Sequence, residues 1–218
     1  MIQAMLLVAA LVLLVGLINA EKTGKPMRIL AFKTPLSTLF IVAWFLEPAQ
    51  NPNVAVLILV ALVFCLSGDI LLAIGSSRAF LGGLVSFLLG HVVYAAAFFT
   101  IGRIGPVMAL GLLGLFAAAA LIWRWLEPHL GRMTSPVLAY IVIISVMLCG
   151  ALGVLNNSAL PAATRGSIIT GAVFFYISDL FVARQRFVID AHMNRVLGLP
   201  LYYVAQFVLA FSAGGIPG

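Results

Sequence analysis

Apolar residues fill most of the chain, in runs of about 20 residues separated by short segments rich in charged residues, proline and glycine. A helical run of this length crosses the hydrocarbon core of a bilayer. The runs lack the alternation of polar and apolar positions that is typical of a membrane β-barrel. The pattern therefore predicts eight transmembrane helices, at residues 2–19, 28–46, 53–74, 80–100, 106–124, 135–155, 163–184 and 197–214.

Composition supports an all-α polytopic membrane protein. Hydrophobic residues make up 64% of the 218 positions and charged residues 8%, whereas a soluble domain has about 25% charged residues. We expect one transmembrane domain over residues 1–218, with the first run retained as a span and not cleaved as a signal peptide. Because the loops are short, any active site must be formed by the helices. Cys65 and Cys149 both lie inside apolar runs, where they are expected to be small core residues.

The net charge of +6 reflects an uneven distribution over the loops and does not indicate a nucleic-acid surface. The loops after spans two, four and six contain only Arg103 and Arg165. By the positive-inside rule, the odd-numbered loops are cytoplasmic and both termini lie outside. The loops after spans one, three, five and seven hold the other loop basic residues: Lys22, Lys25, Arg28, Arg78, Arg124, Arg132, Arg184, Arg186 and Arg195.

Two aspartates inside apolar spans are the main candidates for function. Asp69 lies in VFCLSGDILLA and Asp179 in GAVFFYISDLFVA, each directly after a small residue. A carboxylate inside a transmembrane helix costs roughly 2.5–3.5 kcal/mol on insertion scales, so such residues are usually functional. Both spans run in the same direction, which places the two carboxylates at similar depth in the cytoplasmic half. The alternative is a structural role, such as pairing with Lys33.

The same orientation brings other polar residues toward that depth. Lys33 and Tyr202 lie near the cytoplasmic entries of spans two and eight, and His91 lies nearer the middle of span four. Each also has an ordinary explanation: Lys33 could extend to the interface, and His91 and Tyr140 could be packing residues. Ser67 and Ser178 are expected to bond back to a carbonyl one turn earlier. The aspartate-bearing spans three and seven and the spans that follow them also indicate a 4+4 parallel internal repeat.

Several site types find no support in the sequence. No HExxH motif, cysteine cluster or third intramembrane carboxylate is present, so we expect neither a metal nor a cofactor. No serine lies in a GxSxG elbow with a usable histidine and acid, which argues against a serine hydrolase.

Six stretches together resemble the YhhN-type lysoplasmalogenase family over about residues 33–211. They are FKTPLSTL, VFCLSGDILLA, FLGGLVSFLLGHVVYAAAF, SPVLAYIVIISVM, GAVFFYISDLFVA and LPLYYVAQ. The resemblance implies a multipass membrane hydrolase that splits the vinyl ether of lysoplasmalogens into a fatty aldehyde and a glycerophospho-alcohol. It further implies that Asp69 and Asp179 are the catalytic carboxylates. Lys33, His91, Tyr140 and Tyr202 would then be substrate-binding or supporting residues.

A vinyl ether is stable to base but opens in acid, because protonation of its terminal carbon forms an oxocarbenium ion. Two buried carboxylates can supply a proton donor and a negative charge beside this cation. The sequence does not say which aspartate is the acid. The expected partners are a lysophospholipid substrate and the bilayer, in a bacterial cytoplasmic membrane, with the oligomeric state left open.

Three other functions also fit intramembrane aspartates. A proton-coupled transporter of small molecules or lipids uses the same residue types, although the spans lack matching Gly/Pro interruptions at midplane. An intramembrane aspartyl protease also uses two aspartates, but Asp69 follows LSG and not the expected GxG. A non-catalytic lipid-binding protein would release no product from any lysolipid.

Overall fold

The computed structural model describes all residues, 1–218, as an α-helical bundle without strands. The prediction of an all-α fold is therefore confirmed. The long helices are α1 (Ile2–Glu21), α2 (Pro26–Phe45), α3 (Pro52–Ala73), α4 (Ser77–Ile101), α5 (Pro106–Leu130), α6 (Thr134–Leu155), α7 (Ala162–Ala183) and α8 (His192–Ser212). A 3₁₀ turn, Gly131–Met133, joins α5 to α6, a π-helical turn, Arg184–Val188, follows α7, and a second 3₁₀ turn, Ala213–Gly215, follows α8.

Seven helical stretches are long and apolar enough to cross a membrane. The stretch Pro106–Leu155 is continuous in helical structure, since α5 passes into α6 through the 3₁₀ turn. A multipass membrane protein follows from these helices. Eight separate spans stay a prediction.

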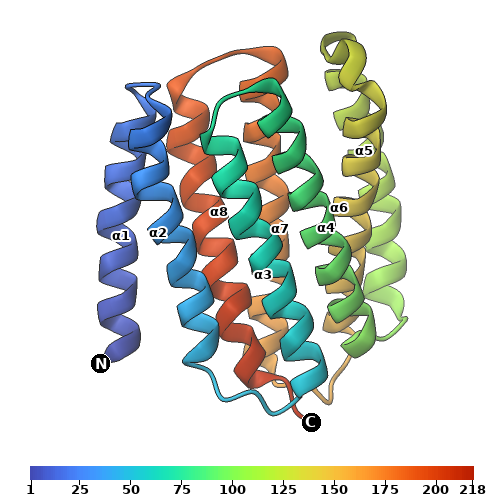
Figure 1. Cartoon of the computed structure of the whole chain (residues 1–218). Coiled ribbons are helices and arrows are strands. Elements are labelled where there is room, and N and C mark those ends of the chain that lie inside the picture. Colours follow the sequence, from blue (N-terminus) through green and yellow to red (C-terminus); the bar gives the residue numbers. More distant parts are fainter.

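The helices run alternately up and down, and the two termini lie at the same end of the bundle (Figure 1). We call the opposite end the distal end; it holds the turns α1–α2, α3–α4, α5–α6 and α7–α8. This is the end predicted to be cytoplasmic from its basic residues.

Local signals explain where the helices start. Proline occupies the first turn of α2, α3 and α5, where its missing N–H costs nothing. The side chain of Asn51 caps α3 by accepting from Val54 N, and Ser76 caps α4 by accepting from Ala79 N. Most boundaries differ from the predictions by a few residues, and two differ by five residues or more. Helix α5 continues past residue 124 and α8 begins before residue 197, because polar residues end an apolar run without ending a helix.

The helices pack most extensively in two hairpins, α3–α4 and α7–α8. Glycines allow this close approach. A Cβ atom on Gly68 would lie 2.6 Å from the Phe87 ring, and one on Gly171 would lie 2.6 Å from the Leu209 side chain. The two similar hairpins fit the predicted internal repeat, which stays a prediction.

We expect Gly68→Ala to destabilise the protein by about 1–3 kcal/mol, because the added methyl must push the Phe87 ring out of a packed core. The unfolding temperature in detergent measures this effect. The matched control is Gly114→Ala on α5, where nothing lies within 4 Å of the new Cβ. That change should be neutral or slightly stabilising. Equal behaviour of the two variants would contradict the proposed role of Gly68.

Candidate active site

A cavity of about 1040 Å³ extends from the bundle interior to the distal end, and both aspartates line it. Its volume is at the upper end of the range for small-molecule sites, roughly 300–1,000 Å³. Apolar side chains of α4, α5, α6 and α7 form much of its wall. The remaining wall comes from α2, α3 and α8, from the α1–α2 turn and from the segment that leads into α8.

Asp69 is fully buried and receives three donors. Its Oδ1 lies 3.1 Å from Lys33 Nζ, and its Oδ2 accepts from Ser37 Oγ and Tyr202 OH, both at 2.6 Å. The Ser37 hydroxyl also lies 3.1 Å from Tyr203 OH. Short hydrogen bonds and an ammonium partner are what an ionised carboxylate requires inside a protein. The Asp69 site is therefore suited to a fixed negative charge.

Helix α2 supplies two of these donors from one face. Lys33 and Ser37 are four residues apart, so their side chains lie one above the other on the helix. Both are buried against α3 and α8, although α2 also presents an apolar surface to the outside of the bundle.

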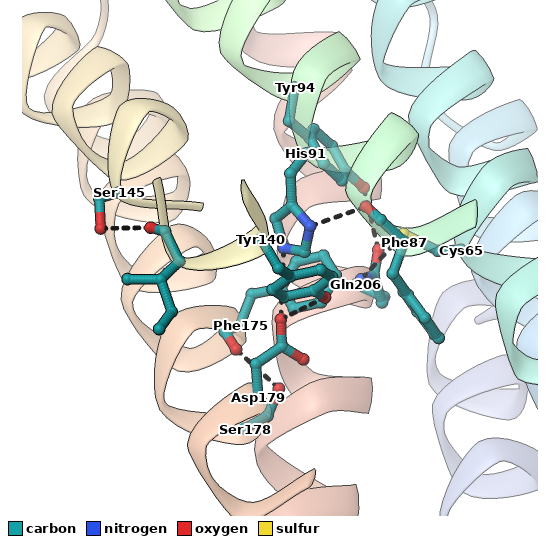
Figure 2. A network of polar contacts seen from close by, with 11 residues as sticks. Cys65, Phe87, His91, Tyr94, Tyr140, Ser145, Phe175, Ser178, Asp179 and Gln206 are labelled. Atoms are coloured by element: carbon teal, nitrogen blue, oxygen red, sulfur yellow. Dashed lines mark hydrogen bonds and ion pairs between the residues drawn. The ribbon is translucent and has the colours of Figure 1, made fainter. Parts of the chain in front are cut away.

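Asp179 has a different set of neighbours (Figure 2). Its Oδ2 accepts from Tyr140 OH at 2.7 Å and lies 3.5 Å from His91 Nε2. The opposite ring nitrogen, His91 Nδ1, lies 2.7 Å from the carbonyl oxygen of Phe87. The Asp179 side chain is 16% exposed and Asp69 only 2%, so Asp179 is the more accessible carboxylate.

The hydrogen-bond partners of His91 determine where its proton sits. A carbonyl oxygen can only accept, so Nδ1 must carry a hydrogen. In a neutral ring, Nε2 then presents a lone pair to the Asp179 carboxylate, and Nε2 has no other partner in the protein. Two acceptors repel each other unless a proton lies between them. The pair of Asp179 and His91 is therefore arranged to hold one proton.

The two carboxylates are held in a crosswise pattern. Asp69, on the first hairpin, is bound by Tyr202 from the second hairpin and by side chains of α2. Asp179, on the second hairpin, faces His91 from the first hairpin and is bound by Tyr140 of α6. Each aspartate thus depends on the helix before it and on the opposite hairpin.

A further buried network joins the hairpins beside the site. Tyr94 OH donates to Gln206 Oε1 at 2.9 Å, and Gln206 Nε2 lies 3.6 Å from Cys65 Sγ (Figure 2). It satisfies polar groups in a core otherwise filled by aromatic rings.

The structure places the six residues singled out from the sequence in two groups, one around each aspartate. Lys33 and Tyr202 contact Asp69, while His91 and Tyr140 contact Asp179. His91, however, is fully buried and is not part of the cavity wall, so it reaches the site only through Asp179.

The predictions for two serines and two cysteines are confirmed. Ser67 bonds to Val63 O at 2.9 Å and Ser178 to Phe175 O at 2.7 Å, as predicted. The two cysteines are buried and free. No group of three His, Cys, Asp or Glu side chains is placed to hold a metal ion.

Sequence reasoning missed Ser37, although it follows Lys33 by one helical turn within the same motif. It also missed the charged cavity mouth. Arg186 and Arg195 line the cavity, whereas Arg78, another basic residue at the distal end, does not.

Comparison with known proteins supplies independent information. Residues 27–213 match the model of the YhhN family. A lysoplasmalogenase of Mycobacterium bovis is 34% identical over 193 residues, which cover 85% of this chain and 69% of the relative. The bovine lysoplasmalogenase TMEM86A is 33% identical over 179 residues (80% and 72%), and the mouse lysoplasmalogenase TMEM86B is 30% identical over 185 residues (84% and 74%). No solved structure matches the chain.

Proposed function

Because this chain belongs to the YhhN family, we propose that it is a lysoplasmalogenase, which hydrolyses the vinyl ether bond of lysoplasmalogens. The observation that carries the proposal is the pair of differently held carboxylates on one cavity wall. Asp69 is an ionised carboxylate held by an ammonium group, while Asp179 faces the Nε2 atom of an imidazole in an arrangement suited to hold one proton. One site thus offers a fixed charge and an acid.

Asp179 is the proton donor in this mechanism. It protonates the vinyl carbon that carries the alkyl chain, and the ether oxygen stabilises the cation that forms on the neighbouring carbon. Asp179, now ionised, takes a proton from the water whose oxygen adds to the cation, which restores the acid. The hemiacetal then loses its hydroxyl proton, the glyceryl oxygen leaves with a proton, and the aldehyde is released. One water is consumed and the carboxyl groups end as they began.

Asp69 acts through its charge. A fixed carboxylate in a cavity screened from water stabilises a developing cation more than it would in solution. Lys33, Ser37 and Tyr202 hold this carboxylate in place. His91 and Tyr140 do the same for Asp179, and His91 is the group with which Asp179 exchanges its proton.

The distal end, toward which the cavity extends, is proposed to face the cytoplasm of a bacterial inner membrane, with both termini outside. The basic residues of the distal turns support this orientation.

The chemistry is tested by offering purified protein an alkenyl lysolipid and its saturated alkyl analogue side by side. We expect free aldehyde, detected by mass spectrometry, from the alkenyl lipid alone, because an alkyl ether cannot be protonated on carbon. Cleavage of the alkyl ether would indicate another hydrolase. Release of no product, together with uptake of solute into proteoliposomes, would indicate a transporter.

A further inference from the structure

The mouth of the cavity carries charged side chains of both signs at the distal end. Glu21 and Lys22 come from the end of α1, and Arg186 and Arg195 come from the π-helical turn and the first turns of α8. Such residues are not needed to bind an alkyl chain or to cleave a vinyl ether. Because they lie between the two carboxylates and the distal end, these residues favour a ligand with a polar group.

Arg195 is positioned by its neighbours. Its Nη1 lies 3.0 Å from Glu21 Oε2, an ion pair that connects α8 to α1. The Glu21 side chain is 5% exposed, whereas that of Arg195 is 38% exposed. A guanidinium group has five N–H donors in a planar fork. Arg195 can therefore keep its bond to Glu21 and still offer donors to a ligand in the cavity.

The segment around these arginines is braced by side chains. Asn194 donates to Gln185 Oε1 and to Ile189 O, each at 2.9 Å, and accepts from Arg184. The Arg186 guanidinium stacks 4.4 Å from the centre of the Phe80 ring. The mouth is thus ordered before any ligand arrives, which lowers the entropic cost of binding.

The distance from the carboxylates to the mouth fits the proposed substrate. Asp179 precedes Arg184, the residue that follows α7, by five residues, which corresponds to a rise of about 7.5 Å along a helix. In a lysoplasmalogen, five bonds separate the ether oxygen from phosphorus. Such a chain spans about 6 Å when extended, at the advance per bond of an extended backbone. With the vinyl ether beside Asp179, the phosphate ends within about 2 Å of the level of Arg184, where the turn that carries Arg186 begins.

We propose that Arg195, held by Glu21 and assisted by Arg186, binds the phosphate of the substrate's glycerophospho headgroup. This assignment rests on the proposed function. It makes the protein a hydrolase of phospholipid-type alkenyl ethers, with the headgroup at the distal end and the chain among the apolar side chains of the cavity. Arginine suits this role because its fork matches two phosphate oxygens at once.

The test compares two substrates across two arginine variants in a neutral detergent, where the substrate carries the only phosphate. The substrates are an alkenyl-glycerophosphocholine and an alkenylglycerol without phosphate. For Arg195→Met we expect kcat/KM on the phospholipid to fall about tenfold or more, as for loss of a charged hydrogen bond. On the alkenylglycerol it should change less than twofold. Arg78→Met, a basic residue at the same end but outside the cavity, is the control and should alter neither.

Other outcomes separate this proposal from its premise. If Arg195→Met lowers kcat/KM equally for both substrates, Arg195 only connects α8 to α1 through its ion pair with Glu21, and the proposal is wrong. If the wild type does not cleave the alkenylglycerol, the turnover of that substrate is replaced by a second measurement, the inhibition of phospholipid cleavage by glycerophosphocholine. Arg195→Met must then weaken the inhibition about tenfold, and unchanged inhibition would overturn the proposal. Absence of aldehyde from every substrate would instead refute the proposed function.

Discussion

Asp179→Asn is expected to lower aldehyde release at least 100-fold, the range for loss of a general acid. Asparagine has the same shape as aspartate but no proton that it can transfer to carbon. Its carbonyl oxygen can take the place of Oδ2 and still accept from Tyr140 OH, and a neutral amide costs less to bury than an ionised carboxylate. The fold should therefore survive while the chemistry is lost.

Turnover of the alkenyl lysolipid by mass spectrometry, together with the unfolding temperature in detergent, measures the two effects separately. Glu127→Gln is the matched control, since Glu127 is an exposed acidic residue of α5 outside the cavity. It should keep full activity. An Asp179→Asn protein with near-normal turnover would exclude Asp179 as the acid.

Lys33→Met is expected to destabilise the protein by about 3–5 kcal/mol, the usual cost of leaving one member of a buried ion pair without its partner. Asp69 would keep Ser37 and Tyr202 as donors but would lose the only cation beside it. The measurement is again the unfolding temperature, and activity should fall with it.

The double variant Lys33→Met/Asp69→Asn separates stability from function. It removes both charges, so most of the lost stability should return, whereas aldehyde release should stay low because the fixed carboxylate is gone. A stable single variant would show that the ion pair contributes little. Recovery of activity in the double variant would show that Asp69 is dispensable for the reaction.

The sequence was sufficient to predict the helices and to single out the two buried aspartates. Apolar runs of bilayer length leave few alternatives, and a carboxylate such as Asp69 within one of them is conspicuous. Helix ends were less predictable: α5 continues to Leu130 because a helix tolerates polar residues where it leaves the apolar layer.

The arrangement of donors could not be predicted in the same way. Which side chains meet depends on how each helix is rotated about its axis, and uniformly apolar helices carry no stripe that indicates this rotation. Lys33 could have extended to the interface, yet it bonds Asp69. The tautomer of His91 depends on the carbonyl of Phe87, a backbone atom that no sequence motif identifies.

The crosswise holding of the carboxylates has a consequence for how activity fails. If the α3–α4 and α7–α8 hairpins drift apart, Asp69 loses Tyr202 and Asp179 loses His91 in the same event. Gradual loosening of the bundle would therefore not leave one aspartate correctly positioned while the other is displaced. Catalytic competence in such an assembly is all-or-none, and inactivation by heat or detergent should follow the separation of the hairpins and precede the melting of the individual helices.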